Sequence, residues 1–481
     1  MLSKSQHLPF YYLLAGITLL RLFVAPQFGL GVDEAHYLLY GRYLDLSYFD
    51  HPPLVGWVQF LFISILGETE FAARLGAIII GSITLWMLYF FIFTITKERT
   101  LALVGALALS ASFIFNALFM MLMPDTLLFI LIIPIILATV ALSEDNSIKN
   151  WLILGLLLGL AGLAKYTAVL FIVPIVLFFI IKKQYHLFYT PKLLIGILPA
   201  LVLIAPVIIW NVQNDWISFT YQSAHVVGAS QINWSGFLES IAAQLGAYSP
   251  FLSPLAFYGL YKALRSDNAT LFLSGLFGIT LILFFTYASL YKTALPHWSA
   301  LFYLLFIPLG SIFVFQKSKR WQTYLKGAIG FGLVLTAILY AELAFKFIPQ
   351  PDYQSLHRDI YGFNIVMKEA NKLLNDTTTQ AIAISHWSVA SRALFYNSPY
   401  PSDVYLIDQR YDQFDIWQNG SPLGKDLLFI NTHDFHTKVA QTMNCDDIIP
   451  AKTVDITLND NKVNTINYIW CRNFQGIKNA P

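Results

Sequence analysis

The amino-acid sequence predicts a mainly α-helical, polytopic membrane protein that ends in a small soluble α/β domain. Of its 481 residues, 57% are hydrophobic and only 12% are charged, whereas an ordinary soluble domain is roughly 25% charged. The charges are also uneven: residues 1–346 hold 33 of the 58 Asp, Glu, Lys and Arg, and the shorter stretch 347–481 holds 25. We therefore expect a transmembrane domain over 1–346 and a soluble domain over 347–481.

This composition excludes several classes of protein. An ordinary soluble enzyme, a disordered chain and a fibrous chain are all too polar or too repetitive to match it. The formal net charge of +2 gives no sign of a basic surface for nucleic acid, and the sequence has no glycine-rich loop of the ATP-binding type. The lipid bilayer, rather than nucleic acid, is therefore the expected environment.

Apolar runs separated by polar breaks predict about eleven membrane-spanning helices. Some of the runs are shorter than the roughly 20 residues that a span usually needs, so flanking polar residues must complete them. The expected spans cover residues 8–24, 71–96, 101–117, 124–142, 151–164, 166–181, 193–211, 238–261, 269–290, 298–316 and 324–346.

The positive charges between these spans predict the orientation of the chain. Lys and Arg concentrate in alternate connections, as they do on the cytoplasmic side of membrane proteins; these connections hold Lys97, Arg99, Lys149, Lys182, Lys183, Lys262, Arg265, Lys317, Lys319 and Arg320. The N-terminus is then cytoplasmic, and an odd number of spans exports the tail. Both cysteines, Cys445 and Cys471, lie in that tail. An exported domain favours a disulfide between them, with two unpaired buried thiols as the alternative.

The first non-cytoplasmic loop, about residues 25–70, is rich in ionisable groups. Asp33 and Glu34 precede a helical apolar pattern, and Asp50 and His51 precede a double proline that can start a second short helix at Leu54. We expect two amphipathic helices lying along the membrane surface. Ionisable groups near the membrane are costly and usually functional, although a solvated loop is the simpler alternative.

Other ionisable groups fall on the same side of the membrane. Asp125 opens a span, Lys165-Tyr166 separates two apolar runs, and Lys292 and His297 precede another span. Each alone has a structural explanation, since a lysine can extend to the membrane surface and a lone histidine is usually structural. Together they suit a reaction site, because carboxylates can act as bases and Lys or His can stabilise a phosphate-like leaving group.

The soluble tail is expected to alternate helix and strand. Residues 347–380 have helical composition, and 381–385 and 426–430 are typical of buried strands. The tail could act as a lid without chemistry, or it could bind an acceptor. In the second case the segment His386-Trp387-Ser388, together with Arg392, would be the contact.

The loop motifs resemble those of a known enzyme family. Asp33-Glu34-Ala35-His36-Tyr37, followed by Asp50-His51-Pro52-Pro53, is similar to the first periplasmic loop of bacterial family 39 glycosyltransferases. Pro124-Asp125-Thr126, Lys165-Tyr166-Thr167 and Pro296-His297-Trp298 resemble later motifs of the same membrane enzymes, which have the GT-C fold. The family includes transferases that add aminoarabinose or galacturonic acid to lipid A or core, and protein O-mannosyltransferases.

The resemblance implies an inverting sugar transfer from a polyprenyl-phosphate donor to lipid A, a polysaccharide or a protein. The reaction would occur on the periplasmic face of the bacterial inner membrane. Asp33 would be the catalytic base and Glu34 would orient it or the acceptor, while Asp50 and Asp125 would form a second acidic site. The residues matched to the donor phosphate or substrate are His36, Tyr37, His51, Lys165, Tyr166, Lys292 and His297.

The resemblance leaves the cofactor requirement open. No cofactor is certain, and a divalent metal held by Asp50 with His51 or His297 is an option. The sequence departs from the aminoarabinose transferases at His51, where those enzymes have a lysine. A histidine there would make the role dependent on pH.

Two other functions fit many of the same observations. A secondary transporter also has many spans and intramembrane charges, but it usually places its substrate groups near the membrane midplane. Here the charges gather on one face, next to a long loop. A polysaccharide polymerase or ligase with a lipid-diphosphate donor is the second alternative.

Overall fold

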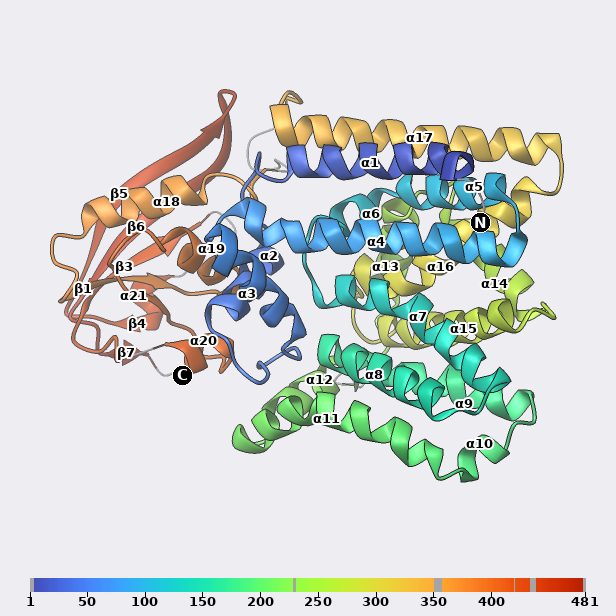
Figure 1. Cartoon of the computed structure of the whole chain (residues 1–481). Helices are drawn as coiled ribbons and strands as arrows, with labels where there is room; N and C mark the ends of the chain where they lie inside the picture. The colour runs from blue at the N-terminus through green and yellow to red at the C-terminus, as the bar shows by residue number, and fades with distance from the viewer. Residues whose placement is uncertain (1–3, 228–230, 350–356, 419, 433–437, 479–481) are drawn as a thin grey trace. The chain divides into compact units, whose positions relative to one another are not determined.

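The computed structural model describes residues 4–227, 231–349, 357–418, 420–432 and 438–478 (Figure 1). Contacts divide the chain into two compact units. The helical unit comprises Met1–Phe23, Asp45–Val58 and Arg74–Leu339, and the α/β unit comprises Val24–Leu44, Gln59–Ala73 and Tyr340–Pro481. The contacts thus assign parts of the first loop to the α/β unit. The division expected from the sequence, into a transmembrane domain over 1–346 and a soluble domain over 347–481, stays a prediction.

The helical unit consists of long apolar helices and short connecting turns. Its elements are η1 (Lys4–His7), α1 (Leu8–Val24), α4 (Glu70–Thr96), α5 (Arg99–Ser110), α6 (Phe113–Leu118), α7 (Pro124–Glu144), α8 (Ile148–Ala164), η2 (Tyr166–Phe171), α9 (Ile172–Ile181), α10 (His186–Tyr189), α11 (Lys192–Gln213), α12 (Ile217–Val227), α13 (Trp234–Ala247), α14 (Ser253–Leu264), α15 (Ala269–Ser289), η3 (Pro296–Ser299), α16 (Ala300–Phe315) and α17 (Lys319–Phe345). Within this unit α8 packs along α11 and α14 packs along α16.

The helices correspond to the expected spans, with two interruptions. Within the described residues, six helices are long and apolar enough to cross a membrane, and five more apolar helices are shorter. The chain is therefore a multi-pass membrane protein, whereas the count of eleven spans stays a prediction. The expected span 101–117 is divided between α5 and α6, and 238–261 is divided between α13 and α14. Ser249 has a φ of +75° and Pro254 starts α14, and neither is compatible with a continuous helix.

The spans differ in how much of their surface the protein covers. The most apolar stretch of Pro296–Phe315 is 83% buried, whereas that of Lys192–Gln213 is only 17% buried. The first is a central helix of the bundle, and the second leaves most of its apolar side chains for lipid. This contrast is expected because a membrane offers an apolar solvent to the outer helices.

The α/β unit is built around a five-stranded sheet of order β2-β1-β3-β6-β5. Strand β1 is parallel to β2 and β3, and β6 is antiparallel to β3 and β5. A second sheet pairs β4 with β7. The elements of this unit are α2 (Val32–Arg42), α18 (Phe363–Leu373), β1 (Gln380–Ile384), α19 (Trp387–Tyr396), β2 (Val404–Leu406), α20 (Gln413–Trp417), β3 (Asp426–Asn431), α21 (Val439–Thr442), β4 (Met443–Asn444), β5 (Asp447–Leu458), β6 (Asn461–Arg472) and β7 (Gly476–Ile477); α3 (Leu54–Leu66) has its C-terminal part here.

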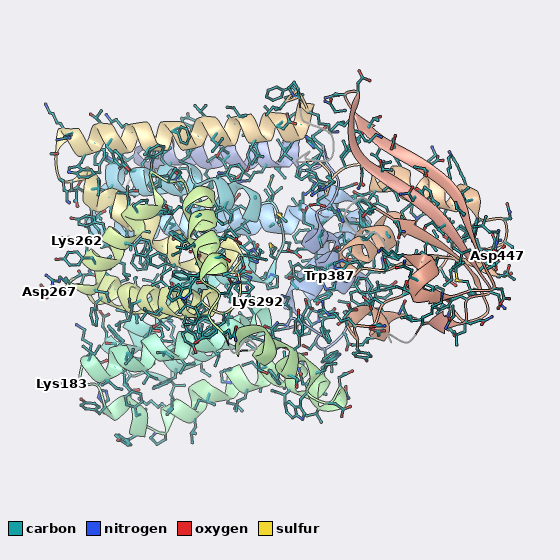
Figure 2. The ribbon with its side chains drawn as sticks, turned by 180° about the vertical axis from the view of Figure 1, so that it is seen from behind. Lys183, Lys262, Asp267, Lys292, Trp387 and Asp447 are labelled. Atoms are coloured by element: carbon teal, nitrogen blue, oxygen red, sulfur yellow. A yellow bond between two sulfur atoms is a disulfide. The ribbon has the colours of Figure 1, made fainter. Side chains whose placement is uncertain are left out.

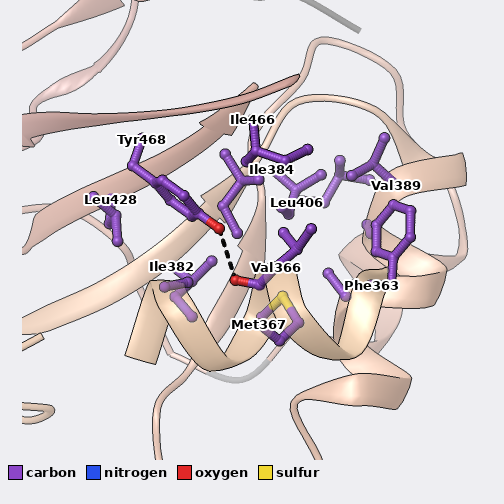
Figure 3. Packing of buried hydrophobic residues seen from close by; sticks show 14 of the residues in the cluster. Phe363, Val366, Met367, Ile382, Ile384, Val389, Leu406, Leu428, Ile466 and Tyr468 are labelled. Carbon is purple, nitrogen blue, oxygen red and sulfur yellow. Dashed lines mark hydrogen bonds between the residues drawn. The ribbon is translucent and has the colours of Figure 1, made fainter. Parts of the chain in front are cut away.

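The sheet has an apolar core on each face, which explains why the strands read as continuous apolar runs. Ile382 and Ile384 of β1 face one core, whereas Ala381 and Ala383 face the other. Figure 3 shows the first core, where Tyr468 packs among the apolar side chains and its hydroxyl donates a 2.9 Å hydrogen bond to the Val366 carbonyl. The strands expected at 381–385 and 426–430 are β1 and β3. The helix expected within 347–380 is α18, and residues 350–356 of that range lie outside the described residues.

A disulfide lies beside the second core. Cys471 of β6 is fully buried in that core, and Cys445 packs against it. Their sulfur atoms are bonded, with Cα atoms 5.4 Å apart. The pairing that the exported tail suggested is therefore present, and it ties β6 to the segment that precedes β5.

The first loop forms the two short helices that the sequence predicts, but they differ in their surroundings. In α2, all residues from Glu34 to Gly41 are buried, so this helix does not lie open on a surface as expected. It packs against α19, and Gly41 allows close contact with α3 because a Cβ there would lie 2.8 Å from the Phe60 nitrogen. Helix α3 instead exposes large apolar side chains, namely Phe60, Leu61, Ile65 and Leu66. That surface is typical of a helix that faces a membrane.

Candidate active site

A buried ion pair joins two of the expected residues in the helical unit. Asp125 lies in the first turn of α7, where the helix dipole favours a carboxylate. Lys165 lies between α8 and η2, and its Nζ is 2.7 Å from Oδ1 and 2.6 Å from Oδ2 of Asp125. The two side chains are only 11% and 5% exposed. The carboxylate therefore neutralises a cation that lies among apolar helices.

His297 belongs to the same polar cluster. It lies in η3, and its ring interacts electrostatically with both Asp125 and Lys165. The next turns add uncharged partners: the Tyr248 hydroxyl donates to the Pro296 carbonyl at 2.8 Å, and Ser299 Oγ donates to Gln244 Oε1 at 2.9 Å. The fold thus brings together three expected residues that lie far apart in the sequence. Sequence reasoning missed Tyr248 and Gln244, although a polar residue within an apolar span was the available signal.

The residue that follows Lys165 in the chain lines an apolar cavity. The cavity has a volume of about 710 Å³ and is lined by side chains of α8, η2, α9 and α11, with Tyr166 and Gln222 among the few polar ones. Tyr166 directly follows Lys165 in the chain. One wall depends on two glycines, because a Cβ at Gly155 of α8 would lie 1.9 Å from the Gly196 carbonyl oxygen of α11. Small residues at such crossings let membrane helices approach closely.

The segment before the double proline is held by polar contacts within the helical unit. The Tyr48 carbonyl accepts from Ser218 Oγ at 2.8 Å, and the Asp50 carbonyl accepts from Gln222 Nε2 at 2.5 Å. Asp45, which the motifs did not single out, accepts from Trp210 Nε1 at 2.8 Å. These bonds position the backbone that carries the expected residues Asp50 and His51, both of which are partly exposed.

The acidic pair of α2 lies in the α/β unit. Both residues occupy the first turn of the helix, where negative charge is favoured. Glu34 is buried, and its carboxylate accepts a 2.9 Å hydrogen bond from the Gly31 amide. This bond caps the helix, so Glu34 fixes the start of α2. Asp33 is partly exposed and is therefore the more accessible of the two carboxylates.

His36 lies within an aromatic cluster of the α/β unit. Its ring centroid is 5.6 Å from that of Trp387 and 5.8 Å from that of Phe414. Ser391 Oγ lies 3.4 Å from its Nδ1. The expected residue Tyr37 follows it and is also buried. Helix α2 is thus fastened to α19 by side chains that the sequence motif had singled out for chemistry.

Titratable groups follow the carboxyl ends of β1 and β2, an edge where parallel sheets commonly bind ligands. Burial lowers the pKa of His386, and Arg410 and Arg392 lower it further. Burial and the neighbouring Asp412 carboxylate raise the pKa of Asp408 to about 6. The acceptor contact suggested for His386 and Arg392 stays a prediction. The Arg392 guanidinium donates to the Asp359 carbonyl at 2.7 Å.

Two expectations receive less support from the geometry. Lys292 is exposed in the turn between α15 and η3 (Figure 2). Within the described residues, no group of three or more His, Cys, Asp or Glu side chains is arranged to hold a metal ion. The suggested set of Asp50, His51 and His297 is therefore not such a group.

Known proteins of related sequence and fold agree on one type of enzyme. Residues 50–210 match the family described as dolichyl-phosphate-mannose-protein mannosyltransferase. The lipid A galacturonosyltransferase RgtD of Rhizobium johnstonii is 28% identical over 390 residues, which cover 76% of this chain and 77% of the relative.

The fold resembles that of ArnT from Cupriavidus metallidurans. The apo structure aligns with a TM-score of 0.67 at 13% identity, and the structure bound to undecaprenyl phosphate aligns with a TM-score of 0.63 at 14% identity. Each alignment covers 96% of this chain and 98% of ArnT. The family match and the curated relative agree that the chain is a glycosyltransferase, its long apolar helices make it a membrane protein, and its fold is the GT-C fold of ArnT.

Proposed function

We propose that this enzyme transfers a sugar from a polyprenyl-phosphate donor to lipid A on the periplasmic face of the bacterial inner membrane. The observation that carries the proposal is the buried Asp125–Lys165 pair together with an apolar cavity of about 710 Å³ that the next residue, Tyr166, lines. The similarity to a lipid A galacturonosyltransferase and to a protein solved with undecaprenyl phosphate supports the acceptor and the donor. The alternation of Lys and Arg along the chain supports the periplasmic orientation.

The donor suits the chemistry of the helical unit. The polyprenyl chain of the donor needs a long apolar cavity. The donor phosphate needs a cation, and a cation is otherwise unfavourable inside a membrane. Lys165 supplies that cation, and Asp125 lies 2.6 Å from its Nζ and compensates its charge while the donor is absent. An arriving phosphate would share Lys165 with Asp125, and His297 would add a second contact to the phosphate oxygens. Tyr166, the residue after Lys165, lines the cavity.

Transfer would then be a single displacement at the anomeric carbon. The acceptor hydroxyl oxygen forms the new bond, the bond from carbon to the phosphate oxygen breaks, and the polyprenyl phosphate leaves with the electron pair. The proton of the hydroxyl passes to a carboxylate, for which Asp33 is our assignment. Attack opposite the phosphate inverts the configuration. Lys165 would stabilise the negative charge that develops on the leaving phosphate.

The test uses purified full-length protein in lipid nanodiscs. Radiolabelled undecaprenyl-phosphate sugars, including galacturonic acid and aminoarabinose donors, are supplied with lipid A, and the label is followed into the acceptor. We expect transfer by the wild type and a loss of at least about 100-fold in Asp33→Asn, because general-base catalysis typically contributes 10²- to 10⁴-fold. Asp267→Asn is the matched control, since Asp267 is exposed at the start of α15 (Figure 2).

The outcomes separate the enzyme class from the residue assignment. If the wild type transfers no sugar from any of these donors to lipid A, the proposed substrates are wrong. If Asp33→Asn keeps near-normal turnover while the wild type is active, the function stands and Asp33 is not the base. Thermal unfolding of each variant shows whether a loss of activity reflects a loss of folding.

A further inference from the structure

The α/β unit has a polar pocket that none of the expected residues lines. Its volume is about 400 Å³, which is within the range of small-ligand pockets, about 300–1,000 Å³. Its walls come from the end of α2, the turn after α3, the end of α19 and the segments around β2 and α20. All of these segments belong to the α/β unit. The pocket is therefore a feature of this unit alone.

One wall of the pocket is aromatic. Tyr43 and Trp417 both line it, and their ring centroids lie 5.1 Å apart at an angle of 30°. Aromatic rings of this kind combine a large apolar face with a polar edge. The faces of pyranose rings, which present C–H groups, pack well on such surfaces. The same wall would be a poor contact for an anion, because the face of an aromatic ring carries partial negative charge.

Polar groups among the lining residues can bind hydroxyls. Among the described residues, the Tyr400 hydroxyl and Gln418 Nε2 have no hydrogen-bond partner, and neither has Asp403 Oδ1. Two of these side chains are fixed: Gln418 Oε1 accepts from the Leu406 amide at 2.6 Å, and Asp403 Oδ2 accepts from Lys425 at 2.9 Å. The pocket thus offers two donors and one acceptor, two of them on anchored side chains. Sugar hydroxyls, which both donate and accept, match this set.

The charges of the pocket are already paired. Arg42 donates from Nε to Glu68 Oε1 at 2.9 Å, and its Nη1 donates to the Leu394 carbonyl at 3.0 Å. Lys425 compensates Asp403 in the same way. Since each carboxylate has its own cation, the pocket presents little net charge. Its chemistry favours an uncharged ligand over a phosphate.

We propose that this pocket binds one or two uncharged pyranose units of the acceptor glycan, so that the α/β unit selects the acceptor. The proposal rests on the proposed function, because a glycolipid acceptor is what brings such sugars to the enzyme. It assigns the binding to Tyr43, Trp417, Tyr400, Gln418 and Asp403, at a site separate from the acidic pair of α2.

The binding test needs no donor and no turnover. Calorimetry and saturation-transfer NMR follow the titration of purified full-length protein with the glucosamine disaccharide of lipid A. This ligand carries N-acetyl groups in place of the fatty acyl chains and has no phosphates. The test variant is the double substitution Tyr400→Phe/Gln418→Glu, which removes one hydroxyl and one donor NH₂ but keeps the ring and the oxygen that binds the Leu406 amide. The matched control is Tyr411→Phe/Gln409→Glu, because both residues are exposed and neither lines the pocket.

We expect the wild type and the control to bind the disaccharide equally, and the test variant to bind at least about tenfold more weakly, the loss expected from removing one to two hydrogen bonds. In the transfer assay, the test variant should raise the acceptor KM by a similar factor and leave kcat and the donor KM unchanged.

Three results would overturn the proposal. They are no binding of the disaccharide by the wild type, equal binding by the test variant and the wild type, and binding only of a phosphorylated disaccharide that inorganic phosphate displaces. If no donor supports transfer but the disaccharide binds in the expected pattern, the proposed function fails and the sugar pocket stands. If transfer occurs with an unchanged acceptor KM in the test variant, the pocket fails and the function stands.

Discussion

The two units of this enzyme contain ion pairs of nearly the same length in opposite surroundings. In the helical unit, Lys165 and Asp125 are 2.6 Å apart with side chains only 11% and 5% exposed. In the α/β unit, Glu369 lies 2.6 Å from Lys372 and 2.7 Å from Lys452, but these lysine side chains are 58% and 46% exposed. Distance therefore does not distinguish the pairs. Burial does, because Coulomb energies rise as the surrounding dielectric constant falls.

The difference shows what burial does to a charged pair, and burial is not confined to one unit, since His357 and Glu342 of the α/β unit are only 2% exposed. A charge among apolar helices must be compensated, so the buried pair holds a cation ready in a place where water cannot screen it. A pair on the surface is screened and contributes little. The α/β unit instead gains its stability from two apolar cores and a disulfide. Four sets of variants test this difference between buried and exposed interactions.

The largest effect is expected from Lys165→Met. This substitution leaves the Asp125 carboxylate buried without its cation, which should destabilise the protein by about 3–5 kcal/mol. The double variant Lys165→Met/Asp125→Leu should regain most of that loss, because apolar replacement of both partners is often neutral. Unfolding in detergent measures both variants. If Lys165→Met alone were as stable as the wild type, the buried ion pair would not contribute to the stability of the protein.

Removing the disulfide tests the second source of stability. Cys445 and Cys471 are 26 residues apart in sequence, and a loop of that length is worth about 3 kcal/mol in the chain-entropy account. We expect Cys445→Ala/Cys471→Ala to unfold at a correspondingly lower temperature. A reducing agent should lower the unfolding temperature of the wild type and leave that of the double variant unchanged. If the reducing agent lowered the unfolding temperatures of both proteins equally, the stabilising role assigned to the Cys445–Cys471 disulfide would be contradicted.

A smaller effect, and one that depends on pH, is expected at Asp408. Its pKa is about 6 in the folded protein and 3.8 ordinarily, so the folded state holds the proton more tightly between these values. Stability should therefore fall as pH rises through this window, and the penalty should be complete above about pH 6. Asp408→Asn should raise the free energy of unfolding by about 1 kcal/mol near pH 7, after allowance for solvent screening, and change it little near pH 4.

Asp376 is the control for that experiment because its shift has the opposite sign. Hydrogen bonds from Thr378 and Thr379 lower the pKa of Asp376. The carboxylate then contributes stability at neutral pH, and this contribution is lost as pH falls through its folded pKa. Asp376→Asn should therefore be destabilising near pH 7 and neutral in strong acid. If both variants respond to pH in the same direction, the explanation of the Asp408 shift is wrong.

The smallest effect is expected for the surface pair. A double-mutant cycle with Glu369→Gln and Lys452→Met should give a coupling below about 1 kcal/mol, and the coupling should shrink as salt is added. The same cycle on Lys165 and Asp125 should give a larger coupling that salt changes little. Equal couplings in the two cycles would remove the distinction between the units.

Several features were predictable because they depend on neighbours along the chain. Apolar length located the long helices of the helical unit, such as α4, α7, α11 and α15, and short apolar runs located β1 and β3, whereas α10 and α12 lie in stretches expected to be connections. Charge alternation placed Asp125, Lys165 and His297 on one side of the membrane, and the fold brings them into one cluster. The interruption of two expected spans could not be predicted in the same way. One of them lies at Ser249, which adopts a positive φ, and serine is not a residue type that usually indicates such a backbone conformation.

Other features depend on contacts between distant segments. Asp45 is bonded to Trp210, and Glu34 is used to cap α2, yet neither role follows from the residues on either side. Helix α2 is apolar enough for a membrane surface, but it is buried against α19. The polar pocket joins residues near position 42 to residues near position 400, so no window of the sequence contains it.

Local features of the sequence identified the class of protein and the residue types available for chemistry, and they predict the orientation of its helices. These follow from hydrophobic length, charge bias and composition, which act locally along the chain. Which carboxylate contacts Lys165, which one caps a helix and which side chains line the polar pocket depend on the tertiary structure. Those outcomes depend on packing and desolvation, and both arise only when segments remote in sequence are brought into contact.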